Sequence, residues 1–316
     1  MKREDVLGEV RQLLARTGFF SPEARLFASP VFDIVARRDA ALVVVKCLLN
    51  GDALTRQASG QLLQVAGMLR GSPLVVAARS SRGALEDGVV YLRHGTPLVS
   101  LKTLRDFLLE GVPPVAFAAP GGYFVPIDSA ALRQARQRRH LSLEALAREA
   151  GVTRRAVQLY EEGMSAAVGA ADRLERFFGE SITFAIDPFT YQWGEGEQGA
   201  AEAAAHDDFE TYVLKALEGM GYKVLQAARC PFDALVEKPG SRILSGIESH
   251  QAAVPARAKT LAAIARVAET DAVMFVPREM KSESIGGTPV VTRRELQRAE
   301  SGDSIIEIIK QRRREA

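Results

Sequence analysis

The feature that most constrains the fold of this chain is an internal repeat. Val31-Phe32-Asp33-Ile34-Val35 is matched by Pro231-Phe232-Asp233-Ala234-Leu235, and Gly95-Thr96-Pro97-Leu98-Val99-Ser100 is matched by Gly287-Thr288-Pro289-Val290-Val291-Thr292. The two matches occur in the same order, with offsets of 200 and 192 residues. A period this long indicates two copies of one domain, because solenoid repeats are only about 20–50 residues long. Chance similarity between two α/β domains is the alternative.

Helical and extended patterns alternate within each copy. In the first copy, residues 7–14 and 62–69 have helical spacing, and residues 32–36, 41–49 and 73–78 are typical of strands. The second copy repeats this order, with helices at 209–217 and 256–268 and strands at 230–236, 242–247 and 271–276. We therefore expect a multidomain α/β (α+β) protein in which each copy is a sheet flanked by helices.

The pattern changes at three places along the chain. Pro120-Gly121-Gly122 separates two apolar stretches and predicts a hairpin close to a first boundary. Residues 193–208 carry five acids and three glycines but no Lys or Arg, which is typical of a solvated linker. The expected segments are an α/β domain at 1–125, a helical segment at 126–190, an acidic linker at 191–208 and a second α/β domain at 209–316.

Composition excludes several classes of protein. A chain of 316 residues is too long for one ordinary core, and no apolar run approaches the roughly 20 residues that span a bilayer. Two cysteines, Cys47 and Cys230, cannot form a disulfide framework or a zinc site. Because the N-terminus leads into a mixed helix rather than an apolar signal core, we expect a cytoplasmic protein with no membrane partner.

The helical segment has the signals of a helix-turn-helix. Asp128 is placed to cap a first helix, and Ser142 caps a helix that ends at Gly151. Thr153 then caps a second short helix that stops at Gly163, and a further helix is expected from about 166 to 178. The residues expected to form the small core are Leu143, Leu146, Ala147, Val152, Val157 and Leu174.

The charge of this segment differs from that of the whole chain. Between Ser129 and Tyr160 there are seven arginines and two acids, a local excess of +5 in a protein whose net charge is +2. Such an asymmetry is typical of a surface that contacts phosphates, and we expect double-stranded DNA as the partner. A helical linker bundle with arginines on a solvated face is the alternative.

The run from Leu141 to Gly163 resembles the phage-repressor-type (XRE-like) helix-turn-helix, over about 50 residues of the chain. The resemblance implies that the second helix of the motif enters the major groove, so that Arg154, Arg155 and Gln158 read base edges. It implies phosphate contacts for the residues Thr153, Ser142 and Arg138. Leu143 stands where the family often has Gln, which suggests fewer base contacts from the preceding helix.

The repeated unit resembles the restriction-endonuclease-like (PD-(D/E)xK) fold, in its topology and in a few residues. Glu4, Asp33 and Lys46 stand where such nucleases carry acids and a lysine, but Val44 occupies the position of the acid two residues before the lysine. Two carboxylates and a lysine are needed to hold magnesium and orient the attacking water. We therefore expect inactive domains, no catalytic residues and no metal, and we interpret Asp33 and Lys46 as a partly buried salt bridge or a relic.

The second copy lacks the lysine altogether. Asp233 is retained and Glu248 lies just beyond the next strand, but no lysine has the required spacing, and Asp207 is a weak counterpart of Glu4. No glycine-rich phosphate-binding motif and no paired His–Cys cluster occurs, so the sequence predicts no cofactor.

Taken over nearly all 316 residues, this order of domains is similar to the archaeal family of helix-turn-helix transcriptional regulators. The resemblance implies a non-enzymatic, sequence-specific regulator of transcription. Proteins with this motif usually read paired half-sites, so we expect a homodimer in which the flanking domains supply the dimer surface or contact the DNA backbone. Two alternatives remain: a magnesium-dependent, structure-specific or Mrr-like nuclease, and a protein-binding scaffold on DNA.

Overall fold

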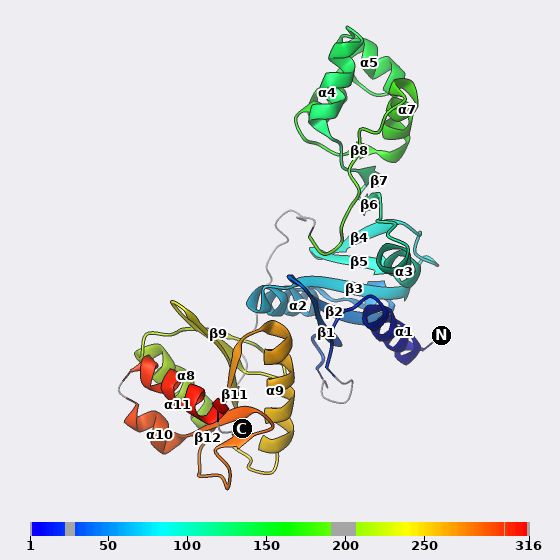
Figure 1. Cartoon of the computed structure of the whole chain (residues 1–316). Coiled ribbons are helices and arrows are strands. Elements are labelled where there is room, and N and C mark those ends of the chain that lie inside the picture. The colour runs from blue at the N-terminus through cyan, green and yellow to red at the C-terminus, as the bar shows by residue number, and fades with distance from the viewer. Residues whose placement is uncertain (1, 23–28, 191–206, 300, 315–316) are drawn as a thin grey trace. The chain divides into compact units, whose positions relative to one another are not determined.

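The structure is a computed structural model that describes residues 2–22, 29–190, 207–299 and 301–314 (Figure 1). The predicted linker therefore lies outside the described residues, except for Asp207 and Asp208, which begin a helix. Contacts divide the chain into two compact units: a first unit of residues 1–6, 48–54 and 74–196, and a second unit of residues 7–47, 55–73 and 197–316. Among the described helices, none combines the length and the apolar character that crossing a membrane requires.

The elements of the first copy follow the predicted alternation. They are α1 (Arg3–Arg16), β1 (Ile34–Arg38), β2 (Ala41–Asn50), α2 (Arg56–Leu69), β3 (Ser72–Arg79), β4 (Val89–Arg93), β5 (Thr96–Ser100) and α3 (Leu101–Leu109). Those of the second copy are α8 (Asp208–Gly219), β9 (Lys223–Gln226), β10 (Ala234–Lys238), β11 (Ser241–Ile247), α9 (Val254–Ala268), β12 (Asp271–Val276), β13 (Ser284–Ile285), β14 (Thr288–Thr292), α10 (Arg293–Arg298) and α11 (Gly302–Arg314).

The two copies have the same topology. The order β1-β2-β3-β5-β4 in one sheet corresponds to β10-β11-β12-β14-β13 in the other. The register is shared as well, because Ile34 pairs with Val45 where Ala234 pairs with Ser245. The mixed α/β class is confirmed, and identical pairing at an offset of 200 residues supports the duplication.

The conserved aspartate of each copy plays the same local role. The carboxylate of Asp33 accepts the backbone N–H of Cys47 at 2.7 Å, and that of Asp233 accepts the N–H of Ile247 at 2.6 Å. In both copies the N–H lies 14 residues after the aspartate, within the neighbouring strand. Each aspartate thus satisfies a backbone group that would otherwise be left unpaired.

The first unit extends the sheet into the helical segment. Strands β6 (Ala116–Ala119) and β7 (Gly122–Val125) form the predicted hairpin, which turns through Pro120 and Gly121. The remaining elements are α4 (Ser129–Arg138), α5 (Leu143–Ala150), α6 (Arg154–Glu161), β8 (Ala166–Ala167) and α7 (Val168–Phe178). The last helix begins two residues later than predicted, because Ala166 and Ala167 pair with β7.

One hydrophobic cluster serves both the sheet and the helices of the first unit. Val89, Ala116 and Val125 belong to the same buried cluster as Leu146 and Leu174 of the helical segment. The helices α4, α5 and α7 are therefore attached to the sheet by packing as well as by strand pairing (Figure 1).

In the second unit, the copies exchange equivalent contacts. Arg37 of β1 donates its Nε–H to the carbonyl oxygen of Val267 in the last turn of α9, at 2.5 Å. Arg242 of β11 likewise donates to the carbonyl oxygen of Met68 in the last turn of α2. Because carbonyls in the last turn of a helix lack partners within the helix, each arginine satisfies the end of the other copy's helix.

Candidate nucleic-acid interface

The helix-turn-helix is built by local capping, as predicted. The Oγ of Ser142 accepts the N–H of Ala145 at the start of α5, and the Oγ1 of Thr153 accepts the N–H of Ala156 at the start of α6. Gly151 ends α5 with a φ of 65°, and a β-carbon there would lie 3.1 Å from the guanidinium of Arg173. The turn between the two helices therefore favours glycine for its backbone conformation, and a larger residue would also have to displace the end of the Arg173 side chain.

The predicted core of the motif is present. Leu146, Ala147, Val157 and Leu174 are buried in one cluster, and Leu143 and Val152 are partly buried against it. This core holds α5 and α6 together and leaves the first turn of α6 exposed to solvent.

Arg154 and Arg155 occupy that first turn. Both side chains are exposed, and neither makes a hydrogen bond or an ion pair with any residue that the structure describes. Two unpaired guanidinium groups on the N-terminal turn of a helix are well placed to donate to guanine edges or phosphates.

Gln158 lies one turn further along α6 and already has a partner. Its Nε2 donates to the Oε1 of Glu162 at 2.8 Å, an exposed contact between positions four apart on the helix. Contacts of this kind contribute only about 0.2–0.5 kcal/mol, so a base edge could displace Glu162 at small cost.

The three residues expected at phosphates also have intramolecular roles. Ser142 and Thr153 use their hydroxyl oxygens as acceptors for the helix caps, which leaves the hydroxyl hydrogens able to donate. Arg138, the last residue of α4, forms an exposed ion pair with Glu180. Exposed pairs contribute about 0–1 kcal/mol, so Arg138 can exchange this partner for a phosphate.

The local charge excess does not all face solvent, which corrects the expectation of a +5 DNA-facing surface. Arg136 binds both carboxylate oxygens of the buried Glu161, at 2.6 and 2.9 Å, and Arg133 approaches the same carboxylate at 3.6 Å. Arg139 donates to the carbonyl oxygens of Phe177 and Phe178 at the end of α7, at 2.7 and 2.8 Å. These contacts hold the motif together. Their acceptors follow residue 160 in the chain, so the charge of residues 129–160 alone does not reveal them.

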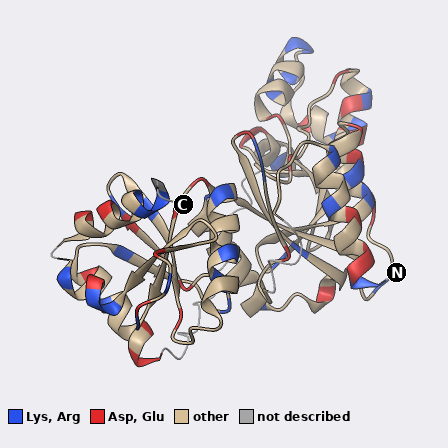
Figure 2. Cartoon of the chain, turned by 60° about the horizontal axis from the view of Figure 1, so that its bottom comes forward, with Lys and Arg blue, Asp and Glu red and all other residues tan. Residues whose placement is uncertain are grey.

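Arg148 is the residue that sequence reasoning left out of the site. It lies in the last turn of α5, is exposed, and has no hydrogen-bond or ion-pair partner among the described residues. Its charge was visible in the sequence, but nothing there distinguished it from the arginines that are held internally. Figure 2 shows both acidic and basic side chains on each of the two sheet-containing parts that the structure describes, in keeping with the near balance of charge.

The first copy has no acid at the position of Val44, two residues before the lysine. Val44 is fully buried in β2, where the second acid would have to stand. Lys46 donates its Nζ to the carbonyl oxygen of Pro30 at 2.5 Å, and Asp33 accepts the Cys47 N–H described above. Glu4 is exposed in the first turn of α1.

In the second copy an arginine lies between the two acids. The NH2 of Arg257 is 2.9 and 2.7 Å from the two carboxylate oxygens of Asp233, and its NH1 is 3.1 Å from the Oε2 of Glu248. Burial lowers the pKa of Arg257 and the two carboxylates raise it, with a net upward shift that keeps the guanidinium charged. Within the described residues, no group of three His, Cys, Asp or Glu side chains is placed to hold a metal ion.

These features define a protein with a helix-turn-helix and two copies of an α/β domain, and two known families match segments of the chain. The PD-(D/E)XK superfamily domain matches residues 3–114, and the helix-turn-helix family matches residues 132–184. A protein of Halorubrum lacusprofundi is 34% identical over 319 residues, which cover 99% of this chain and 98% of that protein. A protein of Methanosarcina barkeri is 31% identical over 321 residues, with the same coverage.

Both relatives carry the name of an HTH-type transcriptional regulatory protein, and so does a protein of Haloquadratum walsbyi that is 33% identical over 99% of this chain and 98% of its own length. The chain belongs to this family. No solved structure matches it.

Proposed function

We propose that the protein is a sequence-specific, DNA-binding regulator of transcription. Helix α6 enters the major groove, where Arg154, Arg155 and Gln158 read base edges. The hydroxyls of Ser142 and Thr153, together with Arg138 and Arg148, contact the phosphates that set the register of the helix on the duplex.

The observation that carries this proposal is the pair of unpartnered arginines on the first turn of a capped, well-packed α6. Four other arginines of the segment are engaged with carboxylates or carbonyl oxygens, whereas Arg154 and Arg155 are exposed and have no partner among the described residues. An arginine kept without a counter-charge beside another arginine is more readily explained by an anionic partner than by a contribution to stability.

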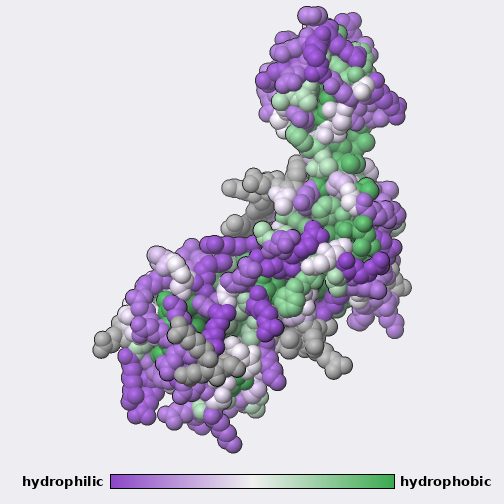
Figure 3. All heavy atoms as spheres, in the orientation of Figure 1, coloured by the Kyte–Doolittle hydropathy of each residue, from purple (hydrophilic) through white to green (hydrophobic). Residues whose placement is uncertain are grey.

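We further infer that the regulator acts as a homodimer that places two α6 helices about one helical turn of DNA apart. The exposed apolar side chains Val112, Val115 and Phe184 of the first unit, which are 55%, 58% and 52% exposed, support a dimer surface near the motif. Figure 3 shows apolar surface between the helical tip and the sheet. Sedimentation equilibrium that shows only monomer, with and without bound DNA, would contradict this inference.

The proposal treats both nuclease-like domains as inactive. Its support is the buried Val44 in the first copy and the charged Arg257 between Asp233 and Glu248 in the second. A nuclease remains the alternative function. Incubation with Mg²⁺ or Mn²⁺ and linear, nicked and branched DNA tests it. Metal-dependent cleavage products that disappear in Asp33→Ala would show that the protein is a nuclease.

Selection of bound fragments from genomic DNA tests the regulator itself. The wild-type protein should enrich a discrete motif, and Arg154→Ala/Arg155→Ala should lose it. Arg278→Ala is the matched control, because Arg278 is exposed and belongs to the other unit. If the double variant enriches the same motif as the wild type, α6 is not the reading helix. If neither the wild type nor the double variant enriches a motif, and the double variant still retains a protein partner in a pull-down, the scaffold alternative holds.

A further inference from the structure

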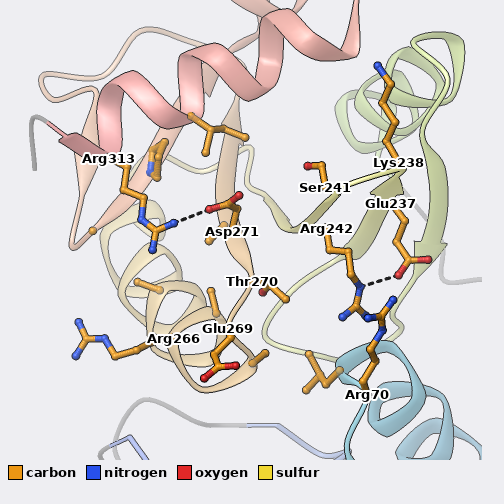
Figure 4. A pocket seen from close by; sticks show the side chains of 18 of the residues that line it. Arg70, Glu237, Lys238, Ser241, Arg242, Arg266, Glu269, Thr270, Asp271 and Arg313 are labelled. Atoms are coloured by element: carbon orange, nitrogen blue, oxygen red, sulfur yellow. Dashed lines mark hydrogen bonds and ion pairs between the residues drawn. The ribbon is translucent and has the colours of Figure 1, made fainter. Parts of the chain in front are cut away.

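A pocket of about 1350 Å³ lies in the second unit. Its walls come from the end of α2, the hairpin of β10 and β11, the last turn of α9 and the start of β12 and β14 (Figure 4). It is separate from the helix-turn-helix, which belongs to the other unit.

The walls of this pocket are rich in basic side chains. Three acids line it, and each is already paired: Glu237 with Arg242 at 2.8 Å, Glu269 with Arg37 at 3.1 Å and Asp271 with Arg313 at 2.6 Å. A fourth cation of the lining, Lys238, is paired with Asp303 at 2.8 Å. The lining acids therefore have no charge left for further cations.

Three cations of the lining remain without a counter-charge. Arg70, Lys223 and Arg266 are exposed and make no side-chain hydrogen bond or ion pair with any described residue. Arg70 is the cap of α2, Lys223 begins β9 and Arg266 lies in α9, so three different parts of the fold bring them to one cavity. An excess of about +3 on the walls of a cavity attracts anions more strongly than the same charges spread over a flat surface.

Two further observations indicate that this pocket has a ligand. The Oγ1 of Thr270, which lines the pocket, is buried and has no hydrogen-bond partner among the described residues. Arg70 caps α2 with a φ of 54°, a left-handed conformation that favours glycine. Residue 70 therefore carries an arginine at the edge of the pocket, at a position whose backbone conformation also suits glycine.

We propose that this pocket binds an anion that carries several phosphate groups. Arginine donates to phosphate through a planar fork of N–H groups, which Arg70 and Arg266 supply, and Lys223 adds a third positive charge. The cavity is larger than the roughly 300–1000 Å³ that hold a drug-sized molecule, so it has room for a nucleotide or for a stretch of nucleic-acid backbone. Both sources present the same phosphate chemistry, and the experiment below distinguishes them.

The test compares two triple variants of the full chain. The pocket variant is Arg70→Gly/Lys223→Ser/Arg266→Ser, in which glycine suits the left-handed backbone at position 70 and so protects folding. The control variant is Arg278→Ser/Lys281→Ser/Arg298→Ser, which removes the same charge from exposed positions outside the pocket. Calorimetric titration with sodium tripolyphosphate and with ATP measures the small-molecule source, and a duplex of random sequence measures the nucleic-acid source.

If the ligand is a small molecule, tripolyphosphate or ATP should bind the wild type and the control, and the pocket variant should bind roughly tenfold more weakly for each cation removed. If the ligand is nucleic acid, only duplex affinity should fall, and the slope of log affinity against log salt should decrease by about three in the pocket variant alone. Equal affinities of the two variants for all three probes would overturn the proposal. Helix α6 is unaltered in both triple variants, so the difference between them reports the pocket alone, and loss of operator binding in Arg154→Ala/Arg155→Ala would leave that difference intact.

Discussion

The ion pair of Arg136 and Glu161 gives the sharpest test of how the charges of the helix-turn-helix are used. Glu161 is only 8% exposed, and both of its carboxylate oxygens accept from Arg136, which also donates to the carbonyl oxygen of Leu141 at 3.1 Å. The hydrogen bond to Glu161 raises the pKa of Arg136 above its ordinary value, so the guanidinium stays charged. Arg136→Met would leave a buried carboxylate without its main partner.

We expect Arg136→Met to destabilise the helical segment by about 3 kcal/mol. Removing one partner of a buried pair costs about 3–5 kcal/mol, and the lower end applies because Arg133 still approaches the carboxylate at 3.6 Å. Hydrogen exchange of the full chain, followed by mass spectrometry of peptides from α4 to α7, should show opening roughly a hundredfold more frequent in this segment.

Two variants complete this experiment. Arg155→Met removes an exposed, unpartnered arginine and should leave the exchange of the segment unchanged. Arg136→Met/Glu161→Met should recover part of the lost protection, because apolar replacement of a buried pair is often neutral or stabilising. The reasoning fails if Arg136→Met exchanges like the wild type and weakens DNA binding as much as Arg155→Met does, since Arg136 would then face DNA.

Three further outcomes follow from the contacts described above. Arg155→Ala should weaken binding to a selected duplex by about 1–3 kcal/mol in fluorescence anisotropy, and an unchanged affinity would remove this residue from the reading surface. Arg257→Met should lower the unfolding free energy by about 3 kcal/mol, because it leaves two partly buried carboxylates without their cation, and a melting temperature equal to that of the wild type would show that the cation is dispensable. Burial raises the pKa of Glu295, but hydrogen bonds from Arg312 and Thr292 lower it by a larger amount, so the net shift is downward from 4.5. Because the folded-state pKa then lies below the unfolded one, this carboxylate stabilises the fold above about pH 4.5, and the stabilisation is lost as the pH falls through the folded-state value. In Glu295→Gln the melting temperature should therefore fall less between pH 4.5 and lower pH than it does in the wild type. An equal fall in both proteins would contradict the pairing of Glu295 with Arg312.

Local chemistry explains which parts of the fold could be predicted from the sequence. Ser142 and Thr153 cap their helices through N–H groups three residues away, and Gly151 takes the left-handed conformation within its own turn. Interactions of this range can be recognised from residue type and spacing alone. The repeat was equally visible, because two copies of one pattern leave the same strands and turns in the same order.

The sequence by itself thus determined the helix-turn-helix, the duplication and the missing acid at Val44. Only the tertiary structure decided which charges are free. Arg136 meets Glu161 25 residues away because α4 packs on α6, and Arg257 meets Asp233 24 residues away because α9 packs on the sheet. A charge becomes structural or remains free for a ligand according to its neighbours in space, and a count along the chain does not contain that information. Arg154 and Arg155 were therefore counted together with arginines that hold the motif together, and packing separated the two groups.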